Sequence, residues 1–162
     1  MTIKVGDRLP DVTLRYREDG EPREVSLGEK LTGRKVAIFG LPGAFTGTCS
    51  TAHLPSFIRT AAAFREKGVD EIICISVNDI WVMEEWDRQS GAGEAGITML
   101  ADTDSEYAKA TGLVFTAPPI GFRDRIVRHS LLAEDGVVTQ LQVEEARGVC
   151  EITAGETLLA LV

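Results

Sequence analysis

The stretch KVAIFGLPGAFTGTCS (35–50), continued by a helical run to Lys67, decides the fold. Its first part, KVAIFG (35–40), is a short apolar run that ends at glycine, which is typical of a strand buried on both faces. After the Pro-Gly turn, apolar residues recur at helical spacing until Gly68 ends the helix. A buried strand, a tight turn and a helix in this order predict an α/β unit, with Cys49 where the turn meets the helix.

The segments on either side extend this pattern into an α/β fold. Apolar runs predict strands at 71–77 and 98–102, helices at 80–86, 105–111 and 156–161, and hairpins at 12–15 with 24–26 and around EDG at 134–136. The segment from Phe115 to Asp124 contains two adjacent prolines and is predicted to be a loop. Strand–helix alternation followed by a hairpin and a helix predicts a mixed β-sheet flanked by helices, as in the thioredoxin-like fold.

Size, charge and composition restrict the class of protein. A chain of 162 residues predicts one compact domain over residues 1–162. The net charge of −8 argues against non-specific nucleic-acid binding. No run of about 20 apolar residues is present, so we expect no membrane span, and the N-terminus has no secretory h-region. Three scattered cysteines in such a chain predict a reducing, cytoplasmic location.

Cys49 is the informative position for chemistry. Free backbone N–H groups and the helix dipole at a helix N-terminus favour the thiolate form of a cysteine, which is its nucleophilic form. The alternative is a buried, unreactive cysteine that packs as a small apolar residue. The polar neighbours Thr48 and Ser50 favour the reactive interpretation. Without a CxxC pair, and with only His53 and His129 as histidines, we expect no metal site, and no haem or flavin ligand set is present.

The motif around Cys49 carries a family resemblance. PGAFTGTC (42–49) matches the P-x-x-x-T-x-x-C signature of the peroxiredoxins, and the longer LPGAFTGTCSTAHLPSF resembles their type II subgroup, also called D-type or fifth peroxiredoxins. ISVND (75–79), MLAD (99–102) and EDGVV (134–138) continue the similarity along nearly the whole chain. Gly47 departs from the pattern, since many relatives carry proline there. The resemblance implies a thioredoxin-like fold and a thiol-dependent peroxidase that reduces hydrogen peroxide and organic hydroperoxides in oxidative-stress defence.

The resemblance also assigns roles around the cysteine. Cys49 would attack the peroxide and become a sulfenic acid. The hydroxyl of Thr46 would bond the thiolate and the peroxide, and Pro42 would shield the pocket and fix the turn. Arg128 would favour the thiolate and stabilise oxygen charge as the O–O bond breaks. Its neighbours Arg123 and Arg125 are predicted to be surface residues.

The remaining cysteines bear on how Cys49 is recycled. Cys74 lies in an apolar run and is predicted to be an inert core thiol. Cys150 lies near the place where some relatives carry a resolving cysteine, so it is a candidate for that role. We favour a one-cysteine cycle with glutathione or glutaredoxin, and keep thioredoxin and a Cys49–Cys150 disulfide as alternatives.

Three further expectations concern neighbouring residues and other functions. His53 follows Cys49 by four residues, and we expect it to fill space and bond a backbone carbonyl rather than assist the thiolate. Phe45, Trp81 and Trp86 are predicted to be packing or interface residues, and the resemblance implies a homodimer. A disulfide reductase is disfavoured because Cys49 has no partner at CxxC spacing. A peroxide sensor that passes oxidation to a partner protein is the main alternative.

Overall fold

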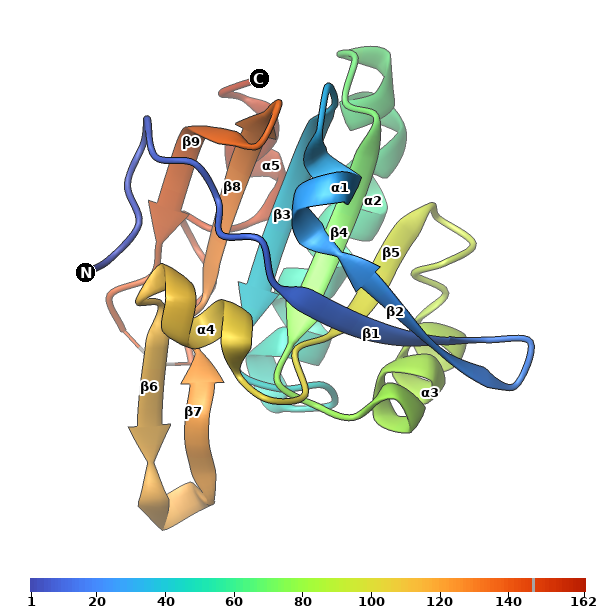
Figure 1. The fold of residues 1–162 in the computed structure, drawn as a ribbon, viewed down its shortest axis with the longest axis vertical. Helices are drawn as coiled ribbons and strands as arrows, with labels where there is room; N and C mark the ends of the chain where they lie inside the picture. The colour runs from blue at the N-terminus through green and yellow to red at the C-terminus, as the bar shows by residue number, and fades with distance from the viewer. Residues whose placement is uncertain (147) are drawn as a thin grey trace.

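A seven-stranded mixed sheet is the centre of the computed structural model, which describes residues 1–146 and 148–162 (Figure 1). The strand order is β2-β1-β5-β4-β3-β8-β9. These strands are β1 (Thr13–Glu18), β2 (Glu21–Ser26), β3 (Lys35–Leu41), β4 (Glu71–Ser76), β5 (Ile97–Ala101), β8 (His129–Glu134) and β9 (Val137–Val143). β3, β4 and β5 are parallel, whereas β8 pairs antiparallel with β3. The predicted mixed sheet is therefore confirmed.

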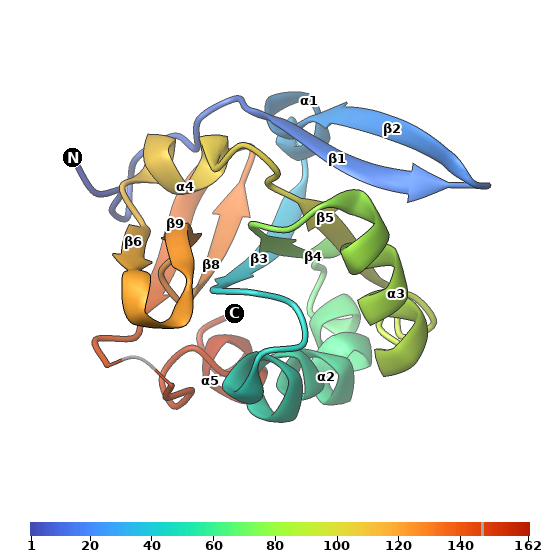
Figure 2. The ribbon, with the colours of Figure 1, turned by 90° about the horizontal axis from the view of Figure 1, so that it is seen from below.

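Helices cover both faces of the sheet, which is why its central strands are apolar throughout (Figure 2). α2 (Leu54–Glu66), α3 (Ile80–Ser90) and α5 (Gly155–Leu159) lie on one side, and α1 (Leu27–Leu31) and α4 (Glu106–Thr111) on the other. Along β3, Phe39 and Leu41 enter the core with α2, while Val36 and Ile38 enter the opposite core. Burial on both faces is what the apolar run at 35–40 predicted.

Local signals in the sequence mark several element ends. Asp79 caps α3, because its side chain accepts a hydrogen bond from the Val82 backbone N–H at 2.8 Å. The β8–β9 hairpin turns at Asp135 and Gly136, whose φ angles of 50° and 77° suit a two-residue hairpin turn. The predicted start of a helix at residue 80 and the predicted hairpin around 134–136 are confirmed. None of the helices in the described ranges has the length and apolar character that crossing a bilayer demands.

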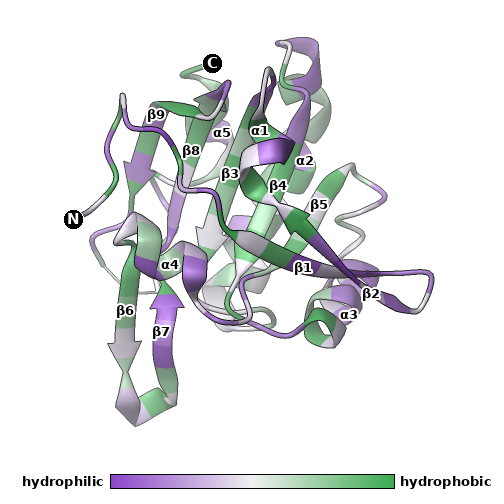
Figure 3. Ribbon diagram, in the orientation of Figure 1, coloured by the Kyte–Doolittle hydropathy of each residue, from purple (hydrophilic) through white to green (hydrophobic). Residues whose placement is uncertain are grey.

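The prediction of a loop between Phe115 and Asp124 was wrong. The chain forms a second, two-stranded sheet of β6 (Val114–Ala117) and β7 (Phe122–Ile126), joined by the 3-10 turn η2 (Pro118–Ile120). The two prolines occupy the turn instead of interrupting a strand. β7 is mostly hydrophilic, in contrast to the central strands (Figure 3), so it lacks the apolar pattern by which a strand is recognised.

The helix predicted from Ser50 to Lys67 begins differently. Its first turn is the π-helix η1 (Cys49–His53), in which the Leu54 N–H donates to the Cys49 carbonyl, and α2 follows. Pro55 has no N–H, and its ring would clash with the carbonyl four residues earlier in a regular α-helix. The wider π turn avoids that clash, and such turns are frequent at functional sites.

Candidate active site

The loop between β3 and η1 is held by a side chain from the segment that connects β4 to α3. Asn78, which follows β4, accepts a hydrogen bond from the Ala44 N–H at 2.9 Å. Phe45 has a φ of 64°, a left-handed conformation that a non-glycine residue adopts only when its surroundings enforce it. The Thr46 carbonyl then accepts from the Ser50 N–H at 3.0 Å, which starts the helix. Cys49 is thereby fixed in the first helical turn.

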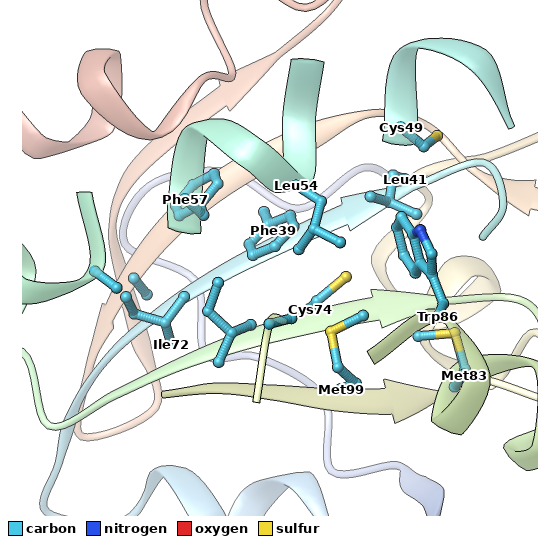
Figure 4. Packing of buried hydrophobic residues seen from close by; sticks show 14 of the residues in the cluster. Phe39, Leu41, Cys49, Leu54, Phe57, Ile72, Cys74, Met83, Trp86 and Met99 are labelled. Carbon is cyan, nitrogen blue, oxygen red and sulfur yellow. The ribbon is translucent and has the colours of Figure 1, made fainter. Parts of the chain in front are cut away.

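Cys49 and Arg128 form the centre of the site. The Cys49 side chain is fully buried at the end of the core formed with α2, whereas Cys74 lies on β4 (Figure 4). Arg128, which directly precedes β8 and is 6% exposed, donates from Nη2 to Cys49 Sγ at 3.1 Å. Arg128 thus places a permanent positive charge against the Cys49 sulfur at the start of the helix.

The second arm of the Arg128 guanidinium contacts His53. Nη1 of Arg128 lies 2.9 Å from His53 Nδ1, and His53 Nε2 lies 3.1 Å from the Thr153 carbonyl oxygen. Arginine only donates, so Nδ1 accepts and Nε2 carries the proton. Burial holds the pKa of His53 well below its ordinary value, and the charges of Arg128 and His129 lower it further. His53 is thus neutral, and it bonds a backbone carbonyl as expected.

Thr46 and Pro42 lie at the mouth of the site. The Thr46 hydroxyl donates to the Gly43 carbonyl at 2.7 Å, which leaves its oxygen lone pairs as acceptors. Pro42, Thr46 and Arg128 line one cavity of about 270 Å³. Its apolar wall is made by three side chains of the β6–β7 hairpin: Phe115, Ile120 and Phe122. The structure therefore brings together Pro42, Thr46, Cys49 and Arg128.

The interpretation of Arg125 as a surface residue was wrong. Its Nη1 donates to the Pro42 carbonyl at 2.9 Å, and its guanidinium lies 4.7 Å from the centre of the Phe122 ring. Burial lowers the pKa of Arg125, although the neighbouring Cys49 opposes that shift. Arg125 thus fastens the hairpin to the active-site loop, while Arg123 is exposed. Because β7 is mostly hydrophilic, nothing in its sequence indicates that Arg125 contacts the active-site loop.

The other two cysteines are free thiols, as is Cys49. Burial raises the pKa of the Cys74 thiol well above its ordinary value, which fits an inert core thiol. Cys150 is half-buried, and burial raises its pKa as well. Its sulfur lies 3.6 Å from Thr153 Oγ1. Cys150 therefore belongs to the same C-terminal segment as the carbonyl that bonds His53.

Comparison with known proteins agrees with this arrangement. The family model described as Redoxin matches residues 4–159. Peroxiredoxin-2E-2, chloroplastic, of Oryza sativa subsp. japonica is 45% identical over 99% of this chain and 73% of its own. Peroxiredoxin-2C of the same species is 41% identical over 97% of this chain and 96% of its own. The chain belongs to the type II peroxiredoxins.

A solved structure supports the same assignment. Reduced Prx3 from Vibrio vulnificus in complex with H₂O₂ has a TM-score of 0.92 and 39% identity, with 99% of each chain covered. The thioredoxin-like fold and the resemblance inferred from the motif at 42–49 are confirmed. This peroxiredoxin is a thiol peroxidase, whose substrates are a peroxide and a reducing thiol.

Proposed function

We propose that Cys49 is the peroxidatic nucleophile of this thiol peroxidase. The observation that supports the proposal most directly is the hydrogen bond from Arg128 Nη2 to Cys49 Sγ, 3.1 Å long and buried beside the cavity. The Cys49 thiolate attacks the terminal oxygen of a hydroperoxide. The S–O bond forms as the O–O bond breaks, the attacked oxygen keeps its hydrogen, and Cys49 becomes a sulfenic acid. The departing alkoxide or hydroxide takes a proton from water.

The neighbouring residues have separate roles in this step. Thr46 accepts the hydrogen bond of the peroxide O–H, because its own hydroxyl hydrogen is already directed to Gly43. Arg128 stabilises negative charge as it passes from sulfur to the departing oxygen. Pro42 shields the pocket and presents its carbonyl to Arg125. The apolar wall of the cavity accommodates the organic part of an alkyl hydroperoxide.

Recycling proceeds, in our proposal, through an external thiol. A glutathione thiolate attacks the sulfenic sulfur and forms a mixed disulfide with Cys49, and the sulfenic oxygen departs as hydroxide, which takes a proton from the solvent. A second thiol, from glutathione or glutaredoxin, then releases the Cys49 thiolate and carries away the disulfide. The half-buried position of Cys150 and its raised pKa support this one-cysteine cycle over rapid resolution by Cys150. Thioredoxin is the alternative reductant.

The proposal also includes the domain organisation, the oligomeric state and the location of the protein. We place one domain over residues 1–162, acting as a cytoplasmic homodimer, and three free thiols support a reducing compartment. The exposed rings of Phe45 and Trp81 (45% and 58% exposed) support an interface role for these residues. The chloroplastic name of one relative concerns that protein alone. A redox relay, in which oxidised Cys49 is attacked by a partner's thiol, uses the same first step.

Peroxide consumption with a thiol reductant tests the function. We expect Cys49→Ser to abolish turnover, and full activity in that variant would disprove the proposal. Intact mass after one equivalent of peroxide, with and without glutathione, tests the cycle. A glutathione adduct on Cys49 and full glutathione-driven turnover in Cys150→Ser support it, whereas a quantitative Cys49–Cys150 disulfide contradicts it. A stable disulfide with a partner protein, without turnover, would indicate the relay.

A further inference from the structure

Glu144 is a buried carboxylate that the peroxidase chemistry does not use. It directly follows β9 and is 8% exposed. Its Oε1 accepts three hydrogen bonds: from the Glu151 N–H at 2.6 Å, the Thr153 N–H at 3.2 Å and the Thr153 hydroxyl at 3.1 Å. A buried carboxylate is costly unless it is bonded in this way. Glu144 thus fixes the C-terminal segment around residues 151–153 against the end of the sheet.

That segment presents the carbonyl on which the site depends. The Thr153 carbonyl accepts the Nε2 proton of His53, which leaves His53 Nδ1 as the acceptor for Arg128. Arg128 in turn bonds Cys49 Sγ. The backbone N–H of Glu144 also donates to the Arg128 carbonyl at 3.0 Å. Glu144 therefore contacts Arg128 through its backbone and reaches it a second time through Thr153 and His53.

The alternative tautomer of His53 would break this chain. A proton on Nδ1 would face the Arg128 guanidinium, which has no lone pair, and Nε2 would face the carbonyl oxygen with no hydrogen between them. Arg128 and the Thr153 carbonyl therefore both require the proton on Nε2. The carbonyl supplies the acceptor for that proton, and in this tautomer Nδ1 accepts the hydrogen bond that holds the guanidinium.

We propose that Glu144 is a positioning residue of the peroxidase site: by holding Thr153 it fixes the tautomer of His53, which keeps Arg128 on the Cys49 sulfur. The inference rests on the proposed roles of Cys49 and Arg128. It adds to these roles that the position of the Arg128 guanidinium depends on the C-terminal segment, which also carries Cys150.

The ring nitrogens of the two histidines give a direct readout. His129 Nδ1 lies 2.8 Å from the Val127 carbonyl oxygen, so the proton of that ring is on Nδ1, the opposite of His53. Long-range ¹H–¹⁵N spectra of ¹⁵N-histidine-labelled protein distinguish the two tautomers, and His129 serves as the internal reference. In the wild-type protein His53 must be the Nε2–H tautomer. A His53 protonated on Nδ1 would overturn the proposal without any variant.

Glu144→Ala and Glu144→Gln separate positioning from simple packing. The amide oxygen of Gln accepts the same bonds, so Glu144→Gln keeps the tautomer and the rate of Cys49 oxidation. We expect Glu144→Ala to lose the defined Nε2–H signal and to oxidise about tenfold more slowly, the effect of losing one hydrogen bond. The exposed neighbour variant Glu145→Ala is the matched control and remains unchanged.

Each outcome decides the inference. An unchanged tautomer in Glu144→Ala, whether or not the rate falls, refutes the positioning role, as does loss of the tautomer in Glu144→Gln. If Glu144→Ala does not fold, Thr153→Val replaces it, because this variant removes the hydroxyl contacts to Glu144 and to the Cys150 sulfur and keeps the backbone N–H bond to Glu144. It is then expected to weaken the His53 signal, and an unaltered signal counts against the proposal. Failure of the peroxidase mechanism itself is distinguishable, since it shows as activity in Cys49→Ser.

Discussion

Replacing Arg128 by lysine separates the charge of this residue from its shape. The guanidinium uses two different nitrogens, Nη2 for Cys49 Sγ at 3.1 Å and Nη1 for His53 Nδ1 at 2.9 Å. A lysine ammonium is a compact charge on a flexible stem, without the planar fork that reaches both partners. Arg128→Lys therefore keeps the positive charge but satisfies only one of the two contacts. Either the sulfur loses its donor, or His53 loses the group that fixes it.

The magnitude follows from the loss of one charge-assisted hydrogen bond. Such a bond contributes about 1.5–3 kcal/mol. At about 1.4 kcal/mol per factor of ten, this corresponds to a peroxide-oxidation rate lower by about 10- to 150-fold. Arg128→Ala removes both bonds and the charge, so it is expected to be slower still. Because Arg128 is 6% exposed, the alanine variant also leaves His53 Nδ1 buried without a donor.

Single-turnover measurement isolates the step in question. Reduced protein is mixed with peroxide under stopped-flow conditions, and formation of the Cys49 sulfenic acid is followed before any reductant acts. Circular dichroism and thermal unfolding establish that the lysine variant is folded, and Arg123→Lys on the exposed part of β7 is the control. An oxidation rate in Arg128→Lys within twofold of the wild-type rate would refute the argument that the fork, and not the charge alone, activates Cys49.

Two further predictions concern stability and the active-site loop. Burial lowers the pKa of His129 to about 4. Between pH ~6.5 and 4, the His129 side chain is therefore protonated in the unfolded chain and neutral in the native state. His129 alone is expected to contribute a loss of about 3 kcal/mol between pH 6.5 and 4, beside the loss that the buried His53 contributes. Urea unfolding measures the total, and an acid limb in His129→Gln as steep as that of the wild-type protein would contradict a contribution from His129. Asn78→Ala removes the acceptor of the Ala44 N–H. We expect the free energy of unfolding to fall by about 1–3 kcal/mol and Cys49 to be oxidised more slowly. An unchanged unfolding midpoint would be evidence against a supporting role for Asn78.

Local pattern was enough to predict most of the sheet. The run at 35–40 is buried on both faces because helices cover the sheet on both sides, so its side chains need no alternation, and a continuous apolar segment is informative. The β6–β7 hairpin has the opposite character. Much of β7 is exposed, so the strand shows neither apolar alternation nor an apolar run. The two prolines of the hairpin lie in the turn η2, between β6 and β7. Strands without a buried face leave no such signal in a single sequence.

Some residues of the site are neighbours in the sequence, whereas others are brought together only by the fold. Pro42, Thr46 and Cys49 lie in one eight-residue motif, so their proximity follows from the chain itself. Arg125 and Glu144 reach the site through contacts between segments far apart in the sequence. Arg125 meets Pro42 across 83 positions, and His53 meets Thr153 across 100. Spacing in one sequence carries no information about such contacts, and only the fold brings them together.

These distant contacts join the recycling step to the oxidation step. Thr153, which holds His53, lies three residues beyond Cys150 on the segment that Glu144 fastens. In the proposed cycle, a reductant that enters through the cavity would leave this segment in place, so that Arg128 would keep its contact with the Cys49 sulfur. A disulfide between Cys49 and Cys150 would instead require a change in the segment that presents the Thr153 carbonyl to His53. The hydrogen bonds of Glu144 to that segment are therefore consistent with the proposed external thiol.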